Sequence, residues 1–186
     1  MTTMDSPGDI LLLLHEDHRQ VEMLLAEFDT VPMGRRNELF WRLVNELVRH
    51  EVAEEVVVYP ALRKLAGGAE VADARLAEQA IAEQKLAGME WLDAESEEFD
   101  RQALTLRSAV LSHARAEEAS VFEILRADVP KVQRFEMGAR YVKAKAAAPT
   151  HPHPHAPDRP PGNVVLGPVA ALLDKIRDRA RQRAAA

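Results

Sequence analysis

The chain has 186 residues, of which 47% are hydrophobic and 29% charged, as expected for one globular domain with an extension. It contains no cysteine, which excludes disulfides, thiolate-bound zinc, iron–sulfur clusters and a cysteine nucleophile. The net charge of −6 is unevenly distributed, because residues 148–186 hold six Lys or Arg against three Asp, and residues 1–147 are strongly acidic. Since nucleic-acid binding requires clustered positive charge, we expect no nucleic-acid partner.

The N-terminal residues carry no targeting pattern. There is no Lys or Arg before Arg19, and the apolar run Ile10 to Leu14 is only five residues long. These features predict neither a signal peptide nor a membrane span, and we expect a cytoplasmic location.

Apolar residues recur every three or four positions through the first half of the chain, which predicts helices. A first helix is expected to begin with Ser6 as N-cap and Pro7 in its first turn, and to run to Phe28. A second helix follows Gly34 and continues towards Leu65, where Gly67-Gly68 ends it. Pro60 interrupts this pattern and predicts a kink near Val58 or Tyr59.

The same periodicity predicts a third helix from about Val71 to Ala94 and a fourth that ends near Asp128. Four long helices with short connectors predict an all-α, up-down-up-down four-helix bundle. A shorter fifth helix is expected over residues 131–147. Both tryptophans, Trp41 and Trp91, are expected to pack in the core.

The C-terminal part divides into a linker and a final helix. The bundle is expected to end at residue 147, and residues 148–163 form a Pro/His-rich linker because their prolines exclude a helix. We interpret His151, His153 and His155 as linker residues. Residues 164–186 predict an amphipathic helix with a basic face, which could dock on the acidic bundle, on a protein partner or on an anionic membrane surface.

Histidine and glutamate residues fall at similar depths in the predicted bundle. His18 and His50 lie at comparable distances from the first connector, and Glu54 and Glu83 from the second. Each of the two HxxxEE patterns, at His50 and at His113, places an imidazole and a carboxylate one helical turn apart. We therefore predict a metal site in one slice of the bundle, with these ligands: His18, His50, Glu54, Glu83, His113 and Glu117.

A salt bridge on a solvated helix face would explain a single His–Glu pair better than a metal site does. Apolar neighbours such as Leu47 and Val110 favour an inward face, where buried charge requires a partner. A Cys-free nitrogen and oxygen donor set suits iron first, then manganese or zinc.

At these residues the chain resembles the hemerythrin-like proteins, the HHE cation-binding domains, and especially their actinobacterial members. The resemblance rests on three segments: the helix around His18, the segment His50–Pro60 with its Tyr-Pro pair, and His113–Glu118. It implies a non-haem di-iron centre, oxo- or hydroxo-bridged, that binds, senses or consumes dioxygen, peroxide or nitric oxide. The third helix departs from the family, because Gln79 stands where the family has a histidine.

Two questions stay open at Gln79 and His15. Gln79 could ligate through its carbonyl oxygen, or the bundle could bind one metal or none. His15 is expected to support the site or an interface rather than to replace the missing imidazole.

Two alternatives to a hemerythrin-like centre remain. A ferritin-like carboxylate oxidase expects Glu three residues before His, but Leu12, His15, Leu47 and Val110 occupy those positions. The other alternative is a degenerate bundle, metal-free or with a single metal, that acts as an interaction module. Because no separate catalytic side chain is visible, we expect a metal- and oxygen-binding protein rather than a substrate-specific enzyme.

Overall fold

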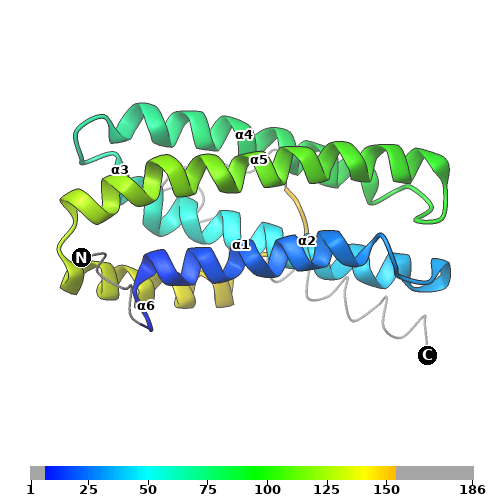
Figure 1. Ribbon diagram of the computed structural model, residues 1–186, viewed down its shortest axis with the longest axis horizontal. Helices are drawn as coiled ribbons and strands as arrows, with labels where there is room; N and C mark the ends of the chain where they lie inside the picture. Colours follow the sequence, from blue (N-terminus) through cyan, green and yellow to red (C-terminus); the bar gives the residue numbers. More distant parts are fainter. Residues whose placement is uncertain (1–6, 154–186) are drawn as a thin grey trace.

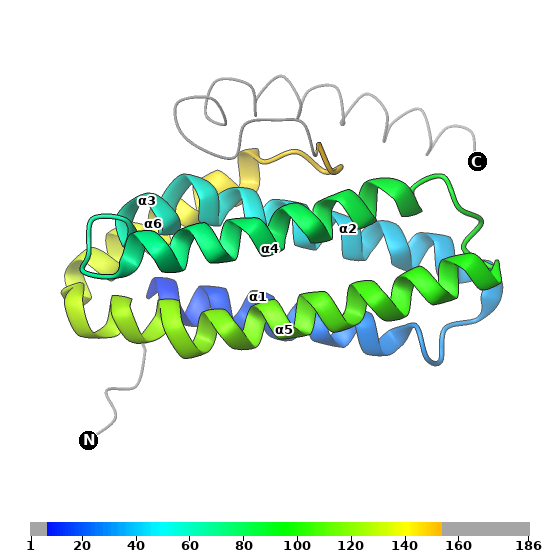
Figure 2. The same cartoon turned by 90° about the horizontal axis from the view of Figure 1, so that it is seen from above.

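The computed structural model describes residues 7–153, which form the predicted all-α, up-down-up-down bundle (Figure 1). Connectors lie alternately at the two ends of the bundle, as Figure 2 shows. The four long helices are α1 (Ile10–Glu27), α2 (Arg36–Ala53), α4 (Gly68–Met89) and α5 (Glu97–Asp128). The short elements are the 3-10 turn η1 (Met33–Arg35), the π turn η2 (Glu54–Val58), α3 (Tyr59–Leu62) and the fifth helix α6 (Lys131–Ala147).

The predicted start of the first helix is wrong by about three residues. Asp9 is the N-cap of α1, and its carboxylate accepts a hydrogen bond from the amide of Leu11 at 3.1 Å. Gly8 precedes it with φ of +88°, a left-handed conformation that a helix cannot contain. The helix therefore begins after Gly8 rather than at Pro7.

Gly67 and Gly68 open α4 instead of ending the second helix. Gly67 has φ of +70° and is the N-cap, and Gly68 is the first helical residue. A Cβ atom on Gly68 would lie 2.0 Å from the carbonyl oxygen of Leu62, so this close turn requires glycine. α4 consequently begins and ends earlier than predicted. Trp91 follows it with 83% exposure, and the prediction that it packs in the core is wrong.

The kink predicted near Pro60 is a π turn. Pro60 has no amide hydrogen to donate back along the helix. The amide of Tyr59 donates to the carbonyl of Glu54, which widens the turn to five residues. This wide turn brings Tyr59 over Glu54, and both side chains are buried.

Apolar side chains fill the bundle in two layers with a polar slice between them. One layer contains Leu14 of α1 and Val121 of α5, and the other contains Val21 and Val110 of the same two helices. Five buried polar residues lie between the layers, one from each of the elements α1, α2, η2, α4 and α5: His18, His50, Glu54, Gln79 and Glu117. The fold thus gathers these five buried polar residues at one level between the two apolar layers.

The first residues of the predicted linker pack on the bundle. His151 is fully buried, its ring lies 4.8 Å from that of Trp41, and its Nδ1 is 3.2 Å from Glu90. The amide of His153 donates to Glu83 at 2.7 Å. His155, the rest of the linker and the predicted helix over residues 164–186 lie outside the described residues. Among the helices of residues 7–153, none has the length and apolar character needed to cross a membrane.

Candidate metal centre

Four helical elements bring their polar side chains to one point inside the bundle. Ligand atoms of His18, His50, Glu54 and Glu117 all lie within 4.8 Å of one another. His113, one turn before Glu117, places its Nε2 atom 3.6 Å from Glu117 Oε2. The structure therefore brings together five of the six residues that the sequence suggested as ligands.

Six buried nitrogen and oxygen atoms that could bind a metal lie at this point, and none of them has a hydrogen-bond partner in the structure. They are the Nε2 atoms of His18, His50 and His113, and the oxygens Glu54 Oε1, Gln79 Oε1 and Glu117 Oε2. An unpartnered buried polar atom costs about 1–3 kcal/mol, so a group of six is not explained by packing alone. Imidazole nitrogens with carboxylate and amide oxygens form a donor set that suits iron, manganese or zinc. The residues present therefore fit a metal centre.

The opposite nitrogen of each imidazole is held by an acidic side chain or a phenol. His18 Nδ1 lies 3.0 Å from Glu118, and His113 Nδ1 lies 2.9 Å from Glu78. His50 Nδ1 lies 2.7 Å from the hydroxyl of Tyr141. Because an ionised carboxylate only accepts hydrogen bonds, Glu118 and Glu78 place the proton on Nδ1. The Nε2 lone pairs then face the cluster, as metal-binding histidines require.

The two central carboxylates are fixed by Tyr59 and Gln79. The hydroxyl of Tyr59 donates to Glu117 Oε1 at 2.8 Å, and the amide of Gln79 donates to Glu54 Oε2 at 2.7 Å. Gln79 also donates to the Tyr59 oxygen at 2.7 Å. These bonds occupy one oxygen of each carboxylate and leave the other oxygen facing the imidazoles.

Burial acts differently on the two carboxyl groups. Burial raises the pKa of Glu54 well above its usual value, and the neighbouring charge of Glu117 adds to this. Burial also opposes ionisation of Glu117, but His113, His18 and His50 outweigh it and lower the pKa of Glu117. The cluster therefore holds one stable carboxylate and one carboxyl that favours a proton until a cation is present.

The pKa values of His18 and His50 are shifted in opposite directions. For His18, Glu117 and Glu118 outweigh burial and raise the pKa. For His50, burial lowers the pKa, and the charge of His18 lowers it further. Because the pKa of His18 is raised, a cation that binds here competes with a proton for this imidazole.

A cavity of about 20 Å³ adjoins the cluster. Its walls include the three imidazoles, the Gln79 amide and the carboxyl of Glu51, and apolar side chains complete it: Val21, Leu47, Ala82, Val110 and Leu111. A cavity needs roughly 10–15 Å³ to hold one water molecule, so this cavity has room for one or two water-sized groups. Burial raises the pKa of Glu51, and the charges of Glu83 and Glu55 add to it.

Glu83 is the one predicted ligand that the structure does not bring into the cluster. It lies one turn beyond Gln79, and its Oε1 accepts the amide of His153. Gln79 occupies the corresponding place in the cluster. His15 lies 3.1 Å from Glu118 and is half exposed, so it contacts the site through the residue that orients His18.

Sequence reasoning missed the residues that orient the imidazoles, although a signal for them exists. Each orienting carboxylate is the immediate sequence neighbour of a cluster residue, but it serves an imidazole on another helix. Glu118 follows Glu117 and orients His18, and Glu78 precedes Gln79 and orients His113. Asp17 precedes His18 and lies 3.4 Å from His50 Nδ1. An acidic residue next to a candidate ligand was therefore the informative pattern.

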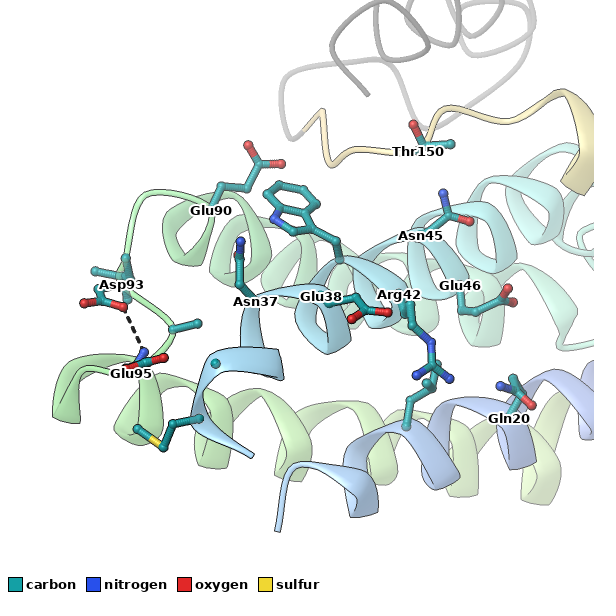
Figure 3. A pocket seen from close by; sticks show the side chains of 16 residues that line it. Gln20, Asn37, Glu38, Arg42, Asn45, Glu46, Glu90, Asp93, Glu95 and Thr150 are labelled. Carbon is teal, nitrogen blue, oxygen red and sulfur yellow. Dashed lines mark hydrogen bonds between the residues drawn. The ribbon is translucent and has the colours of Figure 1, made fainter. Parts of the chain in front are cut away.

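A large surface hollow lies elsewhere and contains none of the cluster residues. It has a volume of about 1060 Å³ and is open to solvent between α2, the α4–α5 connector and Thr150 (Figure 3). Its lining includes five acidic side chains and Arg42: Glu38, Glu46, Glu90, Asp93 and Glu95. We assign the metal chemistry to the buried cluster because it combines unpartnered donors with oriented imidazoles.

Comparisons with known proteins agree with this geometry. The family model described as the Hemerythrin HHE cation binding domain matches residues 9–125. An uncharacterized hemerythrin-like protein of Schizosaccharomyces pombe is 30% identical over 173 residues, which cover 89% of this chain and 83% of that protein. A DNA nickase of Nostoc sp. is 24% identical over 135 residues, which cover 72% of this chain and 38% of the nickase. No solved structure matches the chain.

Proposed function

This chain belongs to the hemerythrin HHE cation-binding family, and on that premise we propose that it holds two iron ions and binds, senses or consumes dioxygen, peroxide or nitric oxide. The observation that carries the proposal is the set of six buried, unpartnered donor atoms at one level of the bundle. The ligands would be His18, His50, Glu54, His113 and Glu117, with Gln79 as the sixth donor.

The spread of the donors favours two ions over one. Glu117 Oε2 lies 3.4 Å from His18 Nε2 and 3.6 Å from His113 Nε2, so this one oxygen faces two imidazoles. His113 is not among the four residues whose ligand atoms all lie within 4.8 Å of one another. A carboxylate between separated imidazoles suits a pair of metals about 3.5–4 Å apart. Gln79 supplies an amide oxygen where an imidazole would bind more tightly, so one ion is expected to be held more weakly.

The size of the adjoining cavity supports a small ligand. A bound iron pair would supply electron transfer and open coordination positions. The chain itself would exclude larger molecules, because the cavity of about 20 Å³ is closed by branched apolar side chains. His18, His50 and His113 would be kept in one tautomer by their acidic and phenolic partners.

The proposal includes no specific organic substrate and no nucleic acid. Among the described residues, the cavity next to the cluster is too small for either. The activity in the name of the Nostoc relative is not carried over, because this chain covers 38% of that protein. We keep a cytoplasmic location and a role in the response to oxidative or nitrosative stress as parts of the proposal. Manganese or zinc remains the second choice of metal.

The basic C-terminal segment is proposed to dock on its own bundle. The described chain ends at His153, and Thr150 already lines the acidic hollow (Figure 3). Residues 164–186 carry five Lys or Arg and two Asp, so their charge complements this surface. Zero-length carbodiimide cross-linking of the full chain should join Lys175 to an acidic residue of the hollow. Cross-links from Lys175 only to other molecules would refute docking in cis.

Metal analysis tests the proposed centre. Anaerobic reconstitution with Fe²⁺ should give close to two ions per chain, and His113→Ala should lose most of the second ion. His151→Ala is the matched control, because His151 is a buried histidine that contacts Trp41 and Glu90 rather than the cluster. Wild-type protein that retains no metal after gel filtration would favour the metal-free interaction module instead.

A further inference from the structure

The fifth helix reaches the metal centre through a buried tyrosine. The hydroxyl of Tyr141, on α6, lies 2.7 Å from His50 Nδ1 and donates to Asp17 Oδ2 at 2.7 Å. Both Tyr141 and His50 are almost completely buried. The other oxygen of Asp17 lies 2.7 Å from the ammonium group of Lys145, also on α6. These four groups form one chain of contacts that ends at a predicted ligand.

We propose that Tyr141 is a positioning residue of the metal centre, which holds the imidazole of His50 in the tautomer whose Nε2 lone pair faces the metal. α6 lies beyond the region matched by the family model, which ends at residue 125. This inference takes from the proposed function only the presence of a metal in the cluster. It assigns α6 a part in the site that the four-helix bundle alone does not supply.

The direction of the hydrogen bonds follows from the chemistry of the groups. Asp17 faces Lys145, which supports its ionised form, and an ionised carboxylate only accepts hydrogen bonds. The hydroxyl of Tyr141 therefore gives its proton to Asp17. Its oxygen then accepts from His50, which places the imidazole proton on Nδ1 and leaves Nε2 free to bind a cation.

α6 is fastened to α1 on both sides of Tyr141. Arg134 forms a buried ion pair with Asp9, the N-cap of α1, at 3.0 Å. Gly138 lies so close to Gly8 that a Cβ atom on Gly138 would be 2.1 Å from the Gly8 carbonyl oxygen. Beyond Tyr141, Lys145 contacts Asp17 and Glu46, and the Lys145 carbonyl accepts from Arg49. The position of the tyrosine hydroxyl is therefore set by tertiary contacts rather than by a flexible segment.

Two substitutions separate positioning from simple packing. Tyr141→Phe removes the hydroxyl but leaves Asp17 Oδ2 3.4 Å from His50 Nδ1, so the carboxylate can partly replace it. In Asp17→Asn the Lys145 ammonium requires an oxygen, which turns the amide nitrogen towards Tyr141. Tyr141 must then donate to His50, and the imidazole proton moves to Nε2. The same reversal explains why an amide in place of the aspartate of a catalytic triad gives the wrong histidine tautomer.

The experiment uses the full chain and Zn²⁺ as a redox-inert probe. Chelator competition should show about tenfold weaker Zn²⁺ binding for Tyr141→Phe and about 100-fold weaker binding for Asp17→Asn, the range typical of residues that orient metal ligands. Met137→Leu is the matched control, since Met137 is a buried α6 residue of the apolar layer. It should bind Zn²⁺ as the wild type does. Thermal unfolding of each metal-free variant shows whether it folds.

A second readout does not depend on metal binding. Nitrogen-15 spectra of the metal-free protein at pH 8 should show His50 protonated on Nδ1 in the wild type and on Nε2 in Asp17→Asn. If the tautomer is the same in both proteins, or if all variants bind Zn²⁺ equally, the positioning role is refuted. If the wild type binds neither Zn²⁺ nor Fe²⁺, the proposed function fails, and the tautomers still decide whether Tyr141 orients His50.

Discussion

Replacing Gln79 with histidine should lower the thermal stability of the metal-free protein and increase its affinity for the second metal ion. In the structure the Gln79 amide donates to Glu54 and to Tyr59, and its oxygen is an unpartnered donor of the cluster. An imidazole at position 79 that turns a nitrogen towards the metal cannot keep both hydrogen bonds. It is also a better iron ligand than an amide oxygen. The two effects therefore have opposite signs in the two states.

The size of the first effect follows from the lost hydrogen bonds. Leaving the buried Glu54 oxygen without its donor costs about 1–3 kcal/mol. For a chain of this length, 1 kcal/mol lowers the melting temperature by about 2–4 °C. Metal-free Gln79→His should thus melt roughly 2–12 °C below the wild type. Iron should raise its melting temperature by more than it raises that of the wild type, and loss of the second ion to a chelator should be slower.

The matched control for this prediction is Gln84→His, on an exposed face of the same helix. It should change neither the melting temperature nor the rate of iron loss. Calorimetry with and without Fe²⁺, followed by stopped-flow chelation, measures both quantities. Equal melting temperatures and equal release rates in wild type and Gln79→His would show that position 79 does not face the metal.

Three further predictions concern the same centre. His50→Ala should lower iron affinity at least 100-fold, because losing a ligand should cost no less than losing a residue that orients one, which costs about 10–100-fold. His151→Ala should retain the wild-type iron content in metal analysis. Because the pKa of His18 is raised, its proton stabilises the metal-free fold below pH about 6.5, and this contribution is lost as the pH rises through the raised value. Metal affinity should correspondingly fall between pH 8 and pH 6 in chelator titrations, and an affinity independent of pH would exclude His18 as a ligand. Glu83→Gln should leave metal affinity unchanged, and a tenfold loss of affinity would show that Glu83 is a metal ligand.

The sequence was sufficient for the bundle and for most of the cluster because both depend on helical spacing. His18, His50 and His113 lie at one depth when residues are counted from the connectors, and the structure places them there. The same count from the connector gave the wrong depth for the third long helix. Residues 63–67 form the connector and contribute no helical rise, and α4 begins at Gly68. The residue level with Glu54 is therefore Gln79 and not Glu83, one turn further on.

The contribution of α6 could not be predicted from local patterns. Tyr141 looks like any apolar position of a short amphipathic helix. Its role depends on how α6 docks on α1, which is set by Asp9, Gly138 and Lys145. Likewise, Trp91 has the side chain of a core residue, but it falls in the turn after α4 and is exposed. Tertiary docking and connector length decide both cases.

We propose that the six unpartnered ligand atoms inside the bundle hold a pair of metal ions. Native mass spectrometry of protein titrated anaerobically with Fe²⁺ tests it most directly. The wild type should saturate at two ions per chain. Glu117→Ala should hold at most one ion tightly, because it lacks the carboxylate that faces both His18 and His113. Saturation at two ions in Glu117→Ala, or no bound iron in the wild type, would contradict this proposal.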